Sequence, residues 1–484
     1  AMIFHRKSVA VYIVLSTFLA VVLIMQSCKY DLAPEPFDDG CYPPEVAEIL
    51  VKKCATSGCH NTISKDAASG LDLSSWEVMF QGNRNGAVCV PYRSDQSTLF
   101  FYINTDTLQG PVSQPTMPFN ASPLTAQEIQ TIKSWIDAGA PDCRGRVKFA
   151  DNPNRPKFYI ANQGCDLISI HDADTKVAMR CVNVGNSVSI ESPHMIRKSP
   201  DGQYWYVSFI NGNVLQKYRT SDDSLVGEAV ISQGSWNTFA LSPDGTKAWV
   251  VDFSVIGRVA YVDLVNMQLL ATYQDPGLFS NPHGSAVSPN GDFLYVTGQL
   301  GNKIYKFDLS TPLIPDYTEI NINTSGGPVA DPHEIAFSPD GNKYFVTCQG
   351  RNEVRIFNAS NDAFIDAIPT AAFPLEMTMS PTNKLLFVSC EVGNSVTVID
   401  MDAMTHVKDI FVGFQPHGLA VDEAEGVVYV ANRNTSTSGG PIPHHTSSCG
   451  GRNGYLTMID LNTLNLVSGF KMELSVDPYS VFVR

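Results

Sequence analysis

Residues 52–61 read KKCATSGCHN, and three of them carry side chains that can bond a metal or a cofactor. Cys54 and Cys59 are separated by four residues, and His60 follows the second cysteine directly. Two thiols and an imidazole suit a covalently attached haem, a zinc site, or a small disulfide loop. The usual haem-attachment motif has only two residues between its cysteines, so the rest of the chain must decide between these sites.

A sixth ligand for a haem iron is available further along the chain. Met117 lies in QPTMPF, where Pro115 and Pro118 stiffen the loop around it. Methionine is the common partner of histidine in electron-transfer cytochromes, where it raises the reduction potential and closes the iron to substrates. The alternative is that Met117 is an ordinary core methionine.

Two predicted helices enclose these residues. Residues 43–54 (PPEVAEILVKKC) begin with prolines, which favour a helix start, and place apolar residues at helical spacing. Residues 124–141 (LTAQEIQTIKSWIDAGAP) contain a capping box between Thr125 and Glu128, followed by isoleucines on one face. The sequence therefore predicts a small all-α domain over residues 41–146. Zinc would need a fourth ligand, and no second Cys/His pair with finger spacing occurs in this segment.

Together these segments resemble the small monohaem cytochrome c domains that are fused to other modules in exported bacterial proteins. The resemblance rests on ILVKKCATSGCHN (49–61), GLDLSSWEVMF (70–80), PTMPF (115–119) and LTAQEIQTIKSWIDAGAP (124–141). It implies one covalent haem c, with thioether bonds from Cys54 and Cys59, His60 as proximal ligand and Met117 as distal ligand. The sequence departs from the usual motif in its four-residue gap, a spacing that some multihaem cytochromes use.

The first 28 residues have the order of an export signal. A basic stretch ending at Lys7 precedes the apolar residues 9–25, and Ser27 precedes Cys28. This order resembles a bacterial lipoprotein signal peptide, after which the mature protein begins at a lipid-modified Cys28. The alternative is an uncleaved transmembrane anchor, because the apolar run reaches the lower limit for a span. Either way we expect an exported, membrane-attached protein on the periplasmic or cell-surface face of the outer membrane, with residues 29–40 as a tether.

Composition and cysteine content limit the class of protein, its partners and its disulfides. The chain has 44% hydrophobic and 17% charged residues and a formal net charge of −15, which is typical of a folded protein and argues against nucleic acid as a partner. The charge does allow docking to a basic redox protein. In an oxidising compartment disulfides are permitted. Cys41 and Cys143 bracket the helical segment and could close it off, whereas Cys165 and Cys181 flank a turn and could cross-link a hairpin.

A repeat fills the remainder of the chain, and its copies follow one another every 42 to 50 residues or so. Each copy has a turn of the Ser-Pro-Asp-Gly type, then an alternating aromatic and β-branched strand, then a second turn and strand. The copies are SPDGQYWYVSFINGN (199–213), SPDGTKAWVVDFSVIG (242–257), SPNGDFLYVTGQLGN (288–302), SPDGNKYFVTCQGRN (338–352), SPTNKLLFVSCEVGN (380–394) and DEAEGVVYVANRN (422–434). A repeat of this length with four antiparallel strands predicts a propeller blade.

The two ends of the repeat region complement each other. The earliest copy, residues 157–184, lacks an inner strand, and the chain ends with DPYSVFVR (477–484), an inner strand without a blade. We therefore expect the C-terminal strand to complete blade one of an all-β seven-bladed propeller over residues 155–484, which leaves no open sheet edge. The copies resemble the YVTN family of seven-bladed propellers, a resemblance that implies a fold and says almost nothing about function.

One column of the aligned copies, five residues before each turn serine, contains polar side chains suited to metal binding. It holds His194, Asn237, His283, His333, Leu375 and His417, with Tyr479 at the equivalent place in the last strand. Equivalent positions on innermost strands form a ring, so His194, His283, His333 and His417 should converge at one mouth of the channel and could hold copper or another transition metal. The alternative, which the recurrence of Pro-His in the repeats favours, is that each histidine bonds backbone groups of the next blade.

The last blade carries an insertion, NTSTSGGPIPHHTSSCGGRNG (434–454), whose Gly and Ser content predicts a flexible, solvated loop. The alternative is that His444, His445 and Cys449 bind a metal or seal a partner interface. The whole chain is predicted to be an exported, lipid-anchored c-type cytochrome that transfers electrons between redox or membrane-complex proteins, with the propeller as docking platform. A first alternative is an oxidoreductase with an active site or a metal in the propeller channel that feeds the haem. A second is a surface binding or scaffold lipoprotein without haem. No catalytic residue is predicted, because the chain has no nucleophile elbow, phosphate loop or dinucleotide fingerprint.

Overall fold

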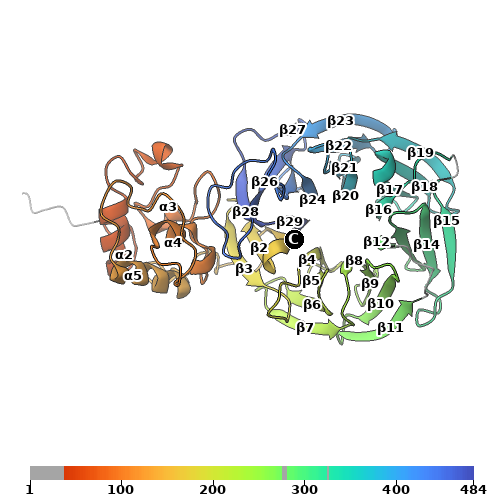
Figure 1. The fold of residues 1–484 in the computed structure, drawn as a ribbon, viewed down its shortest axis with the longest axis horizontal. Coiled ribbons are helices and arrows are strands. Elements are labelled where there is room, and N and C mark those ends of the chain that lie inside the picture. The colour runs from red at the N-terminus through yellow and green to blue at the C-terminus, as the bar shows by residue number, and fades with distance from the viewer. Residues whose placement is uncertain (1–37, 275–280, 324–325) are drawn as a thin grey trace, which may run out of the picture. The chain divides into compact units, whose positions relative to one another are not determined.

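The computed structural model describes residues 38–274, 281–323 and 326–484. The predicted signal peptide, Cys28 and nearly all of the predicted tether lie outside these ranges. The chain divides after Asp39, and Gly40–Arg484 form one compact unit. This unit contains a region of short helices, which precedes strand β1, and a larger region built from strands (Figure 1).

Seven antiparallel sheets are arranged radially in the strand region (Figure 1). Blade one contains β29 (Pro478–Val483), β1 (Lys157–Asn162), β2 (Leu167–Asp172) and β3 (Ala178–Asn183). Blade two contains β4 (Pro193–Lys198), β5 (Tyr204–Phe209), β6 (Val214–Arg219) and β7 (Leu225–Val230). Blade three contains β8 (Trp236–Leu241), β9 (Lys247–Asp252), β10 (Arg258–Asp263) and β11 (Gln268–Gln274).

The other four blades follow in chain order. Blade four contains β12 (Pro282–Val287), β13 (Phe293–Gly298), β14 (Lys303–Asp308) and β15 (Tyr317–Asn321). Blade five contains β16 (Pro332–Phe337), β17 (Lys343–Cys348), β18 (Glu353–Asn358) and β19 (Phe364–Pro369). Blade six contains β20 (Pro374–Ser380), β21 (Leu385–Cys390), β22 (Ser395–Asp400) and β23 (Thr405–Phe411). Blade seven contains β24 (Pro416–Asp422), β25 (Val427–Asn432), β26 (Asn453–Asp460), β27 (Asn465–Leu466) and β28 (Met472–Val476).

The seven-bladed propeller and its closure by the C-terminal strand are confirmed. Strand β29 pairs antiparallel with β1, and in this register Phe482 lies opposite Tyr159. Their rings stack with centroids 4.2 Å apart, and both side chains are buried. Blade one therefore combines strands from both ends of the repeat region, so β1 has no unpaired edge.

The recurring Ser-Pro-Asp-Gly segments form tight turns because their side chains bond their own backbone. In blade two the Ser199 hydroxyl donates to the Asp201 carboxylate and accepts a bond of 3.0 Å from the Tyr204 N–H. Gly202 has φ = +69°, a left-handed conformation that glycine adopts without strain. The same pattern of bonds recurs at Ser242 and Ser338. The strand that follows the turn is therefore positioned in the same way in these three copies.

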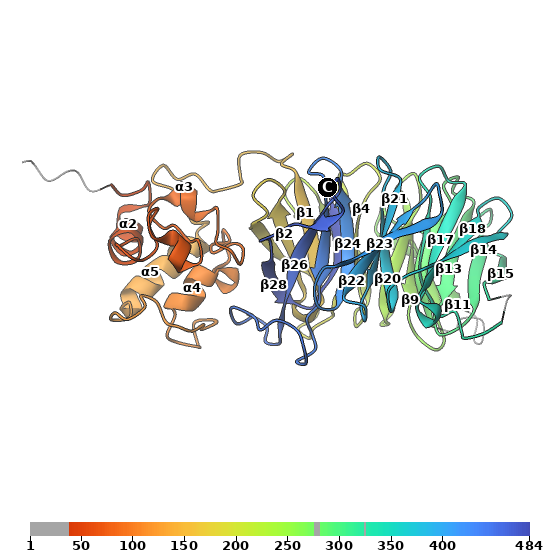
Figure 2. The ribbon, with the colours of Figure 1, turned by 90° about the horizontal axis from the view of Figure 1, so that it is seen from above.

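Four α-helices are described before the propeller: α2 (Pro44–Ile49), α3 (Trp76–Met79), α4 (Thr98–Ile103) and α5 (Ala126–Asp137). A π-helical turn extends α2 over Leu50–Cys54, and short 3-10 turns lie at Lys65–Ala68 and Ser94–Gln96, with two more in the propeller at Gln163–Cys165 and Gln349–Arg351. Figure 2 shows the four helices from a second direction, with α5 next to α2 and α4. The helix predicted over residues 43–54 is thus present as α2 and its extension.

Helix α5 forms as its sequence predicts. The capping box is present, because Glu128 N donates to Thr125 Oγ1 and Thr125 N donates to Glu128 Oε2 over 3.3 and 3.0 Å. The helix buries Ile129, Ile132 and Ile136 on one face. The expectation of a mostly helical domain holds only in part, however, because irregular backbone joins these short helices. A disulfide between Cys41 and Cys143 ties the two ends of this region together, as the sequence suggested.

Replacing Phe482 by alanine tests how strongly ring closure stabilises the fold. Phe482 is 8% exposed and stacks on Tyr159, so Phe482→Ala should lower the free energy of unfolding by about 3–5 kcal/mol. Phe411→Ala on the outer strand β23, where the side chain is 69% exposed, should change it by about 1 kcal/mol or less. Chemical denaturation of both variants provides the comparison. Equal losses would contradict a special role for the closing strand.

Candidate functional site

The two cysteines and the histidine of residues 54–60 lie in one closed loop at the end of α2. Cys54 is the last residue of the π-helical turn. His60 N donates to Cys54 O over 3.1 Å, and Cys59 N donates to Thr56 O over 3.0 Å. These bonds fold the four residues between the cysteines into a compact turn. The two thiols and the imidazole therefore lie in one loop despite the long gap between the cysteines.

Both cysteines of this loop carry free thiols. Elsewhere in the described chain Cys41 bonds Cys143 and Cys165 bonds Cys449. Cys54 is 7% exposed, whereas Cys59 is exposed to solvent. Burial, and then the neighbouring Cys59, raise the pKa of Cys54 to about 12. The structure therefore does not form the alternative Cys54–Cys59 disulfide, and it keeps the thiols that thioether bonds require.

The His60 imidazole is half-buried and is available as a ligand. Its Nδ1 atom is buried and has no hydrogen-bond partner among the described residues. Desolvation lowers the pKa of His60, and a contact with the Leu71 backbone offsets part of that effect. The ring is therefore neutral at pH 7, which is the form that binds iron. A buried imidazole nitrogen without a protein partner fits a metal-bonding role.

Met117 lies in a separate loop that packs against the same hydrophobic core as Cys54. Its N–H donates to Tyr102 O over 2.7 Å, which ties the loop to the end of α4. The Tyr102 hydroxyl in turn donates to His444 O over 2.8 Å. Met117 is thus partly buried and its loop is tied to α4, but its bond to iron stays a prediction.

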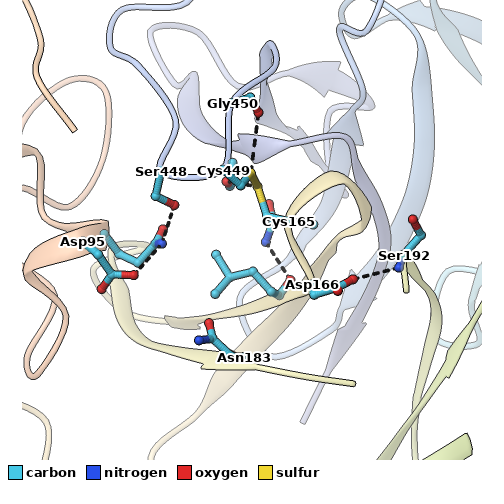
Figure 3. Close-up of a disulfide and its surroundings, with 12 residues drawn as sticks. Asp95, Cys165, Asp166, Asn183, Ser192, Ser448, Cys449 and Gly450 are labelled. Atoms are coloured by element: carbon cyan, nitrogen blue, oxygen red, sulfur yellow. Dashed lines mark hydrogen bonds between the residues drawn. A yellow bond between two sulfur atoms is a disulfide. The ribbon is translucent and has the colours of Figure 1, made fainter. Parts of the chain in front are cut away.

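The insertion over residues 434–454 is largely exposed to solvent, as the sequence predicted, but it is also anchored at several points. Cys449 is bonded to Cys165 in the turn before β2 (Figure 3). Ser448 Oγ accepts a bond of 2.6 Å from Gln96 Nε2, and His444 contacts Tyr102. The predicted Cys165–Cys181 cross-link is wrong, because Cys165 pairs with the insertion and Cys181 stays a free thiol.

A second candidate site lies where the innermost strands of the propeller begin. All seven residues of the aligned column line one cavity of about 340 Å³, and they are His194, Asn237, His283, His333, Leu375, His417 and Tyr479. Each is the second residue of its strand, and these strands are β4, β8, β12, β16, β20, β24 and β29. The alignment of the repeats therefore identified a real ring of side chains, whose metal-binding role stays a prediction.

The rings of this cavity lie in close contact with one another. The imidazoles of His283 and His333 have centroids 3.8 Å apart. Tyr479 lies between His417 and His194, with centroid distances of 3.6 and 4.1 Å. All five side chains are buried. Because these rings are buried against one another, each imidazole is poorly accessible to water. Its nitrogens must therefore be hydrogen-bonded by protein groups or bound by a ligand.

Hydrogen bonds satisfy only some of these nitrogens. His417 Nδ1 lies 3.0 Å from Tyr479 O, which is the backbone bond to the next blade that the repeat pattern suggested. His194 Nδ1 lies 2.7 Å from Gln163 Oε1. His194 Nε2, His283 Nδ1 and His333 Nδ1 have no partner among the described residues. A purely structural role therefore does not account for every histidine of the ring.

Burial keeps these histidines uncharged. It lowers the pKa of His283 to about 4 and lowers the pKa values of His194, His333 and His417 well below their usual range. Four neutral imidazoles in one cavity are suited to binding transition metals.

Two acidic residues next to the histidine ring were missed by the sequence analysis. Glu334 follows His333 on β16, and Glu376 occupies the equivalent place on β20. Burial raises the pKa of Glu334 to about 7 and that of Glu376 to about 8. Arg197 Nη2 lies 3.8 Å from Glu334 Oε1. The sequence did contain a sign of these acidic residues. In two consecutive repeats the residue after the aligned position is glutamate, whereas the other repeats have small or uncharged residues there.

One comparison with protein families supports the propeller fold. A family model described as "Lactonase, 7-bladed beta-propeller" matches residues 280–409, roughly a quarter of the chain. No curated protein matches the sequence. A solved hydrazine synthase of Kuenenia stuttgartiensis is similar, with 19% identity and a TM-score of 0.48 over 62% of this chain and 91% of that chain.

Two further solved structures are similar at comparable levels. A functionally unknown protein from Desulfotomaculum acetoxidans has 16% identity and a TM-score of 0.49 over 66% of this chain and 99% of that chain. The dihydro-haem d1 dehydrogenase NirN, solved in complex with DHE, has 13% identity and a TM-score of 0.49 over 69% of this chain and 76% of that chain. At such identities these likenesses do not assign a ligand or a reaction to this chain.

The two thiols of the loop should differ in reactivity when the protein is produced without haem attachment. Cys59 is exposed, whereas Cys54 is buried and its pKa is raised to about 12. We expect iodoacetamide to label Cys59 roughly tenfold faster or more in the native protein, because access and thiolate content control the reaction. Fragment-resolved mass spectrometry distinguishes the two sites, and unfolding should make the rates similar. Equal native rates would contradict the described burial.

Proposed function

We propose that this protein is an exported, lipid-anchored c-type cytochrome that passes electrons between protein partners. One observation carries the proposal: Cys54 and Cys59 are free thiols in the same closed loop as His60, whose Nδ1 atom is buried without a partner in the described chain. A covalently bound haem would supply a one-electron redox centre there. The donor set of two thiols, an imidazole and a thioether fits that group.

The residues of this chain would hold the haem in complementary ways. Cys54 and Cys59 would bond the haem through thioether links, while His60 and Met117 would be its iron ligands. The buried side chains around Cys54 exclude water from one side of the site, which favours a stable potential. With His60 and Met117 both bound to the iron, the haem would transfer electrons and would not bind a substrate at the iron.

The rest of the chain would serve this role by location and docking. The formal net charge of −15 suits an encounter with a basic redox protein. The propeller offers a rigid surface for such partners, and a lipid on Cys28 would keep the protein at a membrane. In the part of the chain that the structure describes, we find no helix with the length and hydropathy needed to cross a bilayer.

Substituting the proposed distal ligand tests the function. In a host with a haem-attachment system the wild-type protein should show reduced c-type absorption bands. Met117→Leu should lower the reduction potential by on the order of 100 mV or more, because the thioether ligand raises it. Spectroelectrochemical titration measures both properties.

Met79→Leu is the matched control for this experiment. Met79 is fully buried in the same helical region, and a Met to Leu change conserves volume at a cost of less than about 1.5 kcal/mol. This variant should keep the wild-type potential. A colourless wild-type protein would overturn the proposed function, and an unchanged potential in Met117→Leu would remove Met117 from the iron.

Membrane attachment can be tested at Cys28. A lipoprotein loses its anchor in Cys28→Ser, so this variant should leave the membrane fraction. Cys181→Ser, which alters a half-buried free cysteine of the propeller, should stay with the membranes like the wild-type protein. Fractionation followed by immunoblotting gives the answer. A Cys28→Ser protein that remains membrane-bound would favour the alternative of an uncleaved apolar span.

A second candidate function is favoured by the cavity of about 340 Å³ in the propeller. Its histidine ring, together with Arg433 over the Tyr479 ring at 4.9 Å, provides polar groups that could position a small substrate. In this alternative the propeller oxidises a substrate and the haem accepts the electrons. Reduction of the haem by a small molecule, lost when the ring histidines are replaced, would favour this alternative over simple electron transfer.

A further inference from the structure

Three buried side chains of the propeller channel each leave one ligand atom unsatisfied. His283 Nδ1, His333 Nδ1 and Glu334 Oε2 have no hydrogen-bond partner among the described residues. The three residues are only 5%, 3% and 3% exposed. A buried polar atom without a partner costs about 1–3 kcal/mol, and a bound ion would offset that cost.

These residues converge on one point. One ligand atom from each of His283, His333 and Glu334 lies within 4.8 Å of the other two. Ligand atoms bound to one ion at about 2.1 Å lie no more than about 4.2 Å apart. Small side-chain rotations therefore suffice to bring the two imidazoles and the carboxylate onto a single ion.

The backbone explains how two successive residues reach the same site. Side chains of neighbouring strand residues normally point to opposite faces. The pairing of β16 with β17 shifts register between Pro332 and Ile335, and such a bulge redirects a side chain. The Glu334 N–H donates to Thr347 Oγ1 over 2.9 Å instead of extending the regular strand pairing. His333 and Glu334 can therefore both face His283 of the neighbouring blade.

The surroundings of Glu334 leave one of its oxygens available. Ile335 N donates to Oε1 over 3.2 Å, and Arg197 lies 3.8 Å from the same oxygen. The Ser285 backbone of the neighbouring blade also contacts this carboxylate, while Oε2 has no hydrogen-bond partner among the described residues. Outer contacts of this kind orient carboxylate ligands in metal sites.

We propose that His283, His333 and Glu334 bind one divalent first-row transition metal ion in the propeller channel. Two imidazoles and one carboxylate suit ions such as Zn²⁺, Fe²⁺ and Co²⁺ and leave coordination positions open towards the cavity. His194 and His417, which the aligned column also contains, are not among the three converging residues. The site does not rest on the proposed haem, because no residue of the helical region takes part in it.

Metal titration of the untagged full-length protein tests the proposal. After treatment with a chelator, Zn²⁺ should bind with one strong site per chain in isothermal titration calorimetry. Co²⁺ should give visible absorption bands of a low-coordinate ion. Glu334→Gln, which keeps the size of the side chain, should weaken Zn²⁺ binding roughly tenfold or more, and His283→Ala combined with His333→Ala should abolish it.

His171→Gln is the matched control. His171 is as buried as the proposed ligands, but its Nδ1 lies 3.3 Å from Lys176 O and its Nε2 lies 3.0 Å from Ser169 Oγ. This variant should bind Zn²⁺ like the wild-type protein. Absence of a strong Zn²⁺ site in the wild-type protein, or unchanged Zn²⁺ binding in Glu334→Gln, would overturn the proposal. Should the double histidine variant fail to fold, the Glu334→Gln result alone decides.

The haem-free variant separates this proposal from the proposed function. Protein with Cys54→Ser and Cys59→Ser lacks the thioether bonds but keeps the propeller, so it should still bind one Zn²⁺. Loss of Zn²⁺ binding in this variant would overturn the independence of the two sites. A wild-type protein without haem that still binds Zn²⁺ at Glu334 would reject the cytochrome and keep the channel site.

Discussion

The pairing of the last strand with the first blade is the constraint on which the rest of the structure depends. Because β29 pairs with β1, the seven sheets close and their innermost strands form one ring. Only a closed ring places His194 and His417 on either side of Tyr479, a residue of the closing strand itself. The geometry of the channel is thus set by a contact between residues more than three hundred positions apart in sequence.

The closing strand and the helical region contribute to the same hydrophobic core. Phe482 of the closing strand and Cys54 of the thiol loop belong to one continuous cluster of buried apolar side chains. The insertion in blade seven adds contacts from Ser448 and His444 to the helical region, and its disulfide from Cys449 to Cys165 fixes the insertion to blade one. Packing of this kind would limit the loss of side-chain entropy on binding of the proposed haem, because the loops that carry Cys54 and Met117 are already ordered.

How much could be predicted from the sequence depended on the range of the interactions. The capping box of Thr125 and Glu128 and the repeat turns use neighbouring residues, so the helix and the blades followed from local patterns. Glu334 was missed because a bulge redirects its side chain, and no periodic pattern shows a bulge in advance. The bond between Cys165 and Cys449 spans 284 residues, and cysteine spacing alone does not determine such a partner.

In the helical region, too, only some of the features could be predicted from the sequence. Its terminal disulfide and its last helix were predictable, whereas its irregular loops follow from packing and not from periodicity. The proposed role of Cys54, Cys59, His60 and Met117 rests on residue chemistry, with which the two free thiols and the unpartnered Nδ1 atom of His60 are compatible. Mass spectrometry of a proteolytic peptide that spans residues 54–60, from protein made in a haem-attaching host, tests that role most directly. We expect a peptide carrying one haem on both cysteines, and an unmodified peptide with two free thiols would contradict the proposed haem attachment.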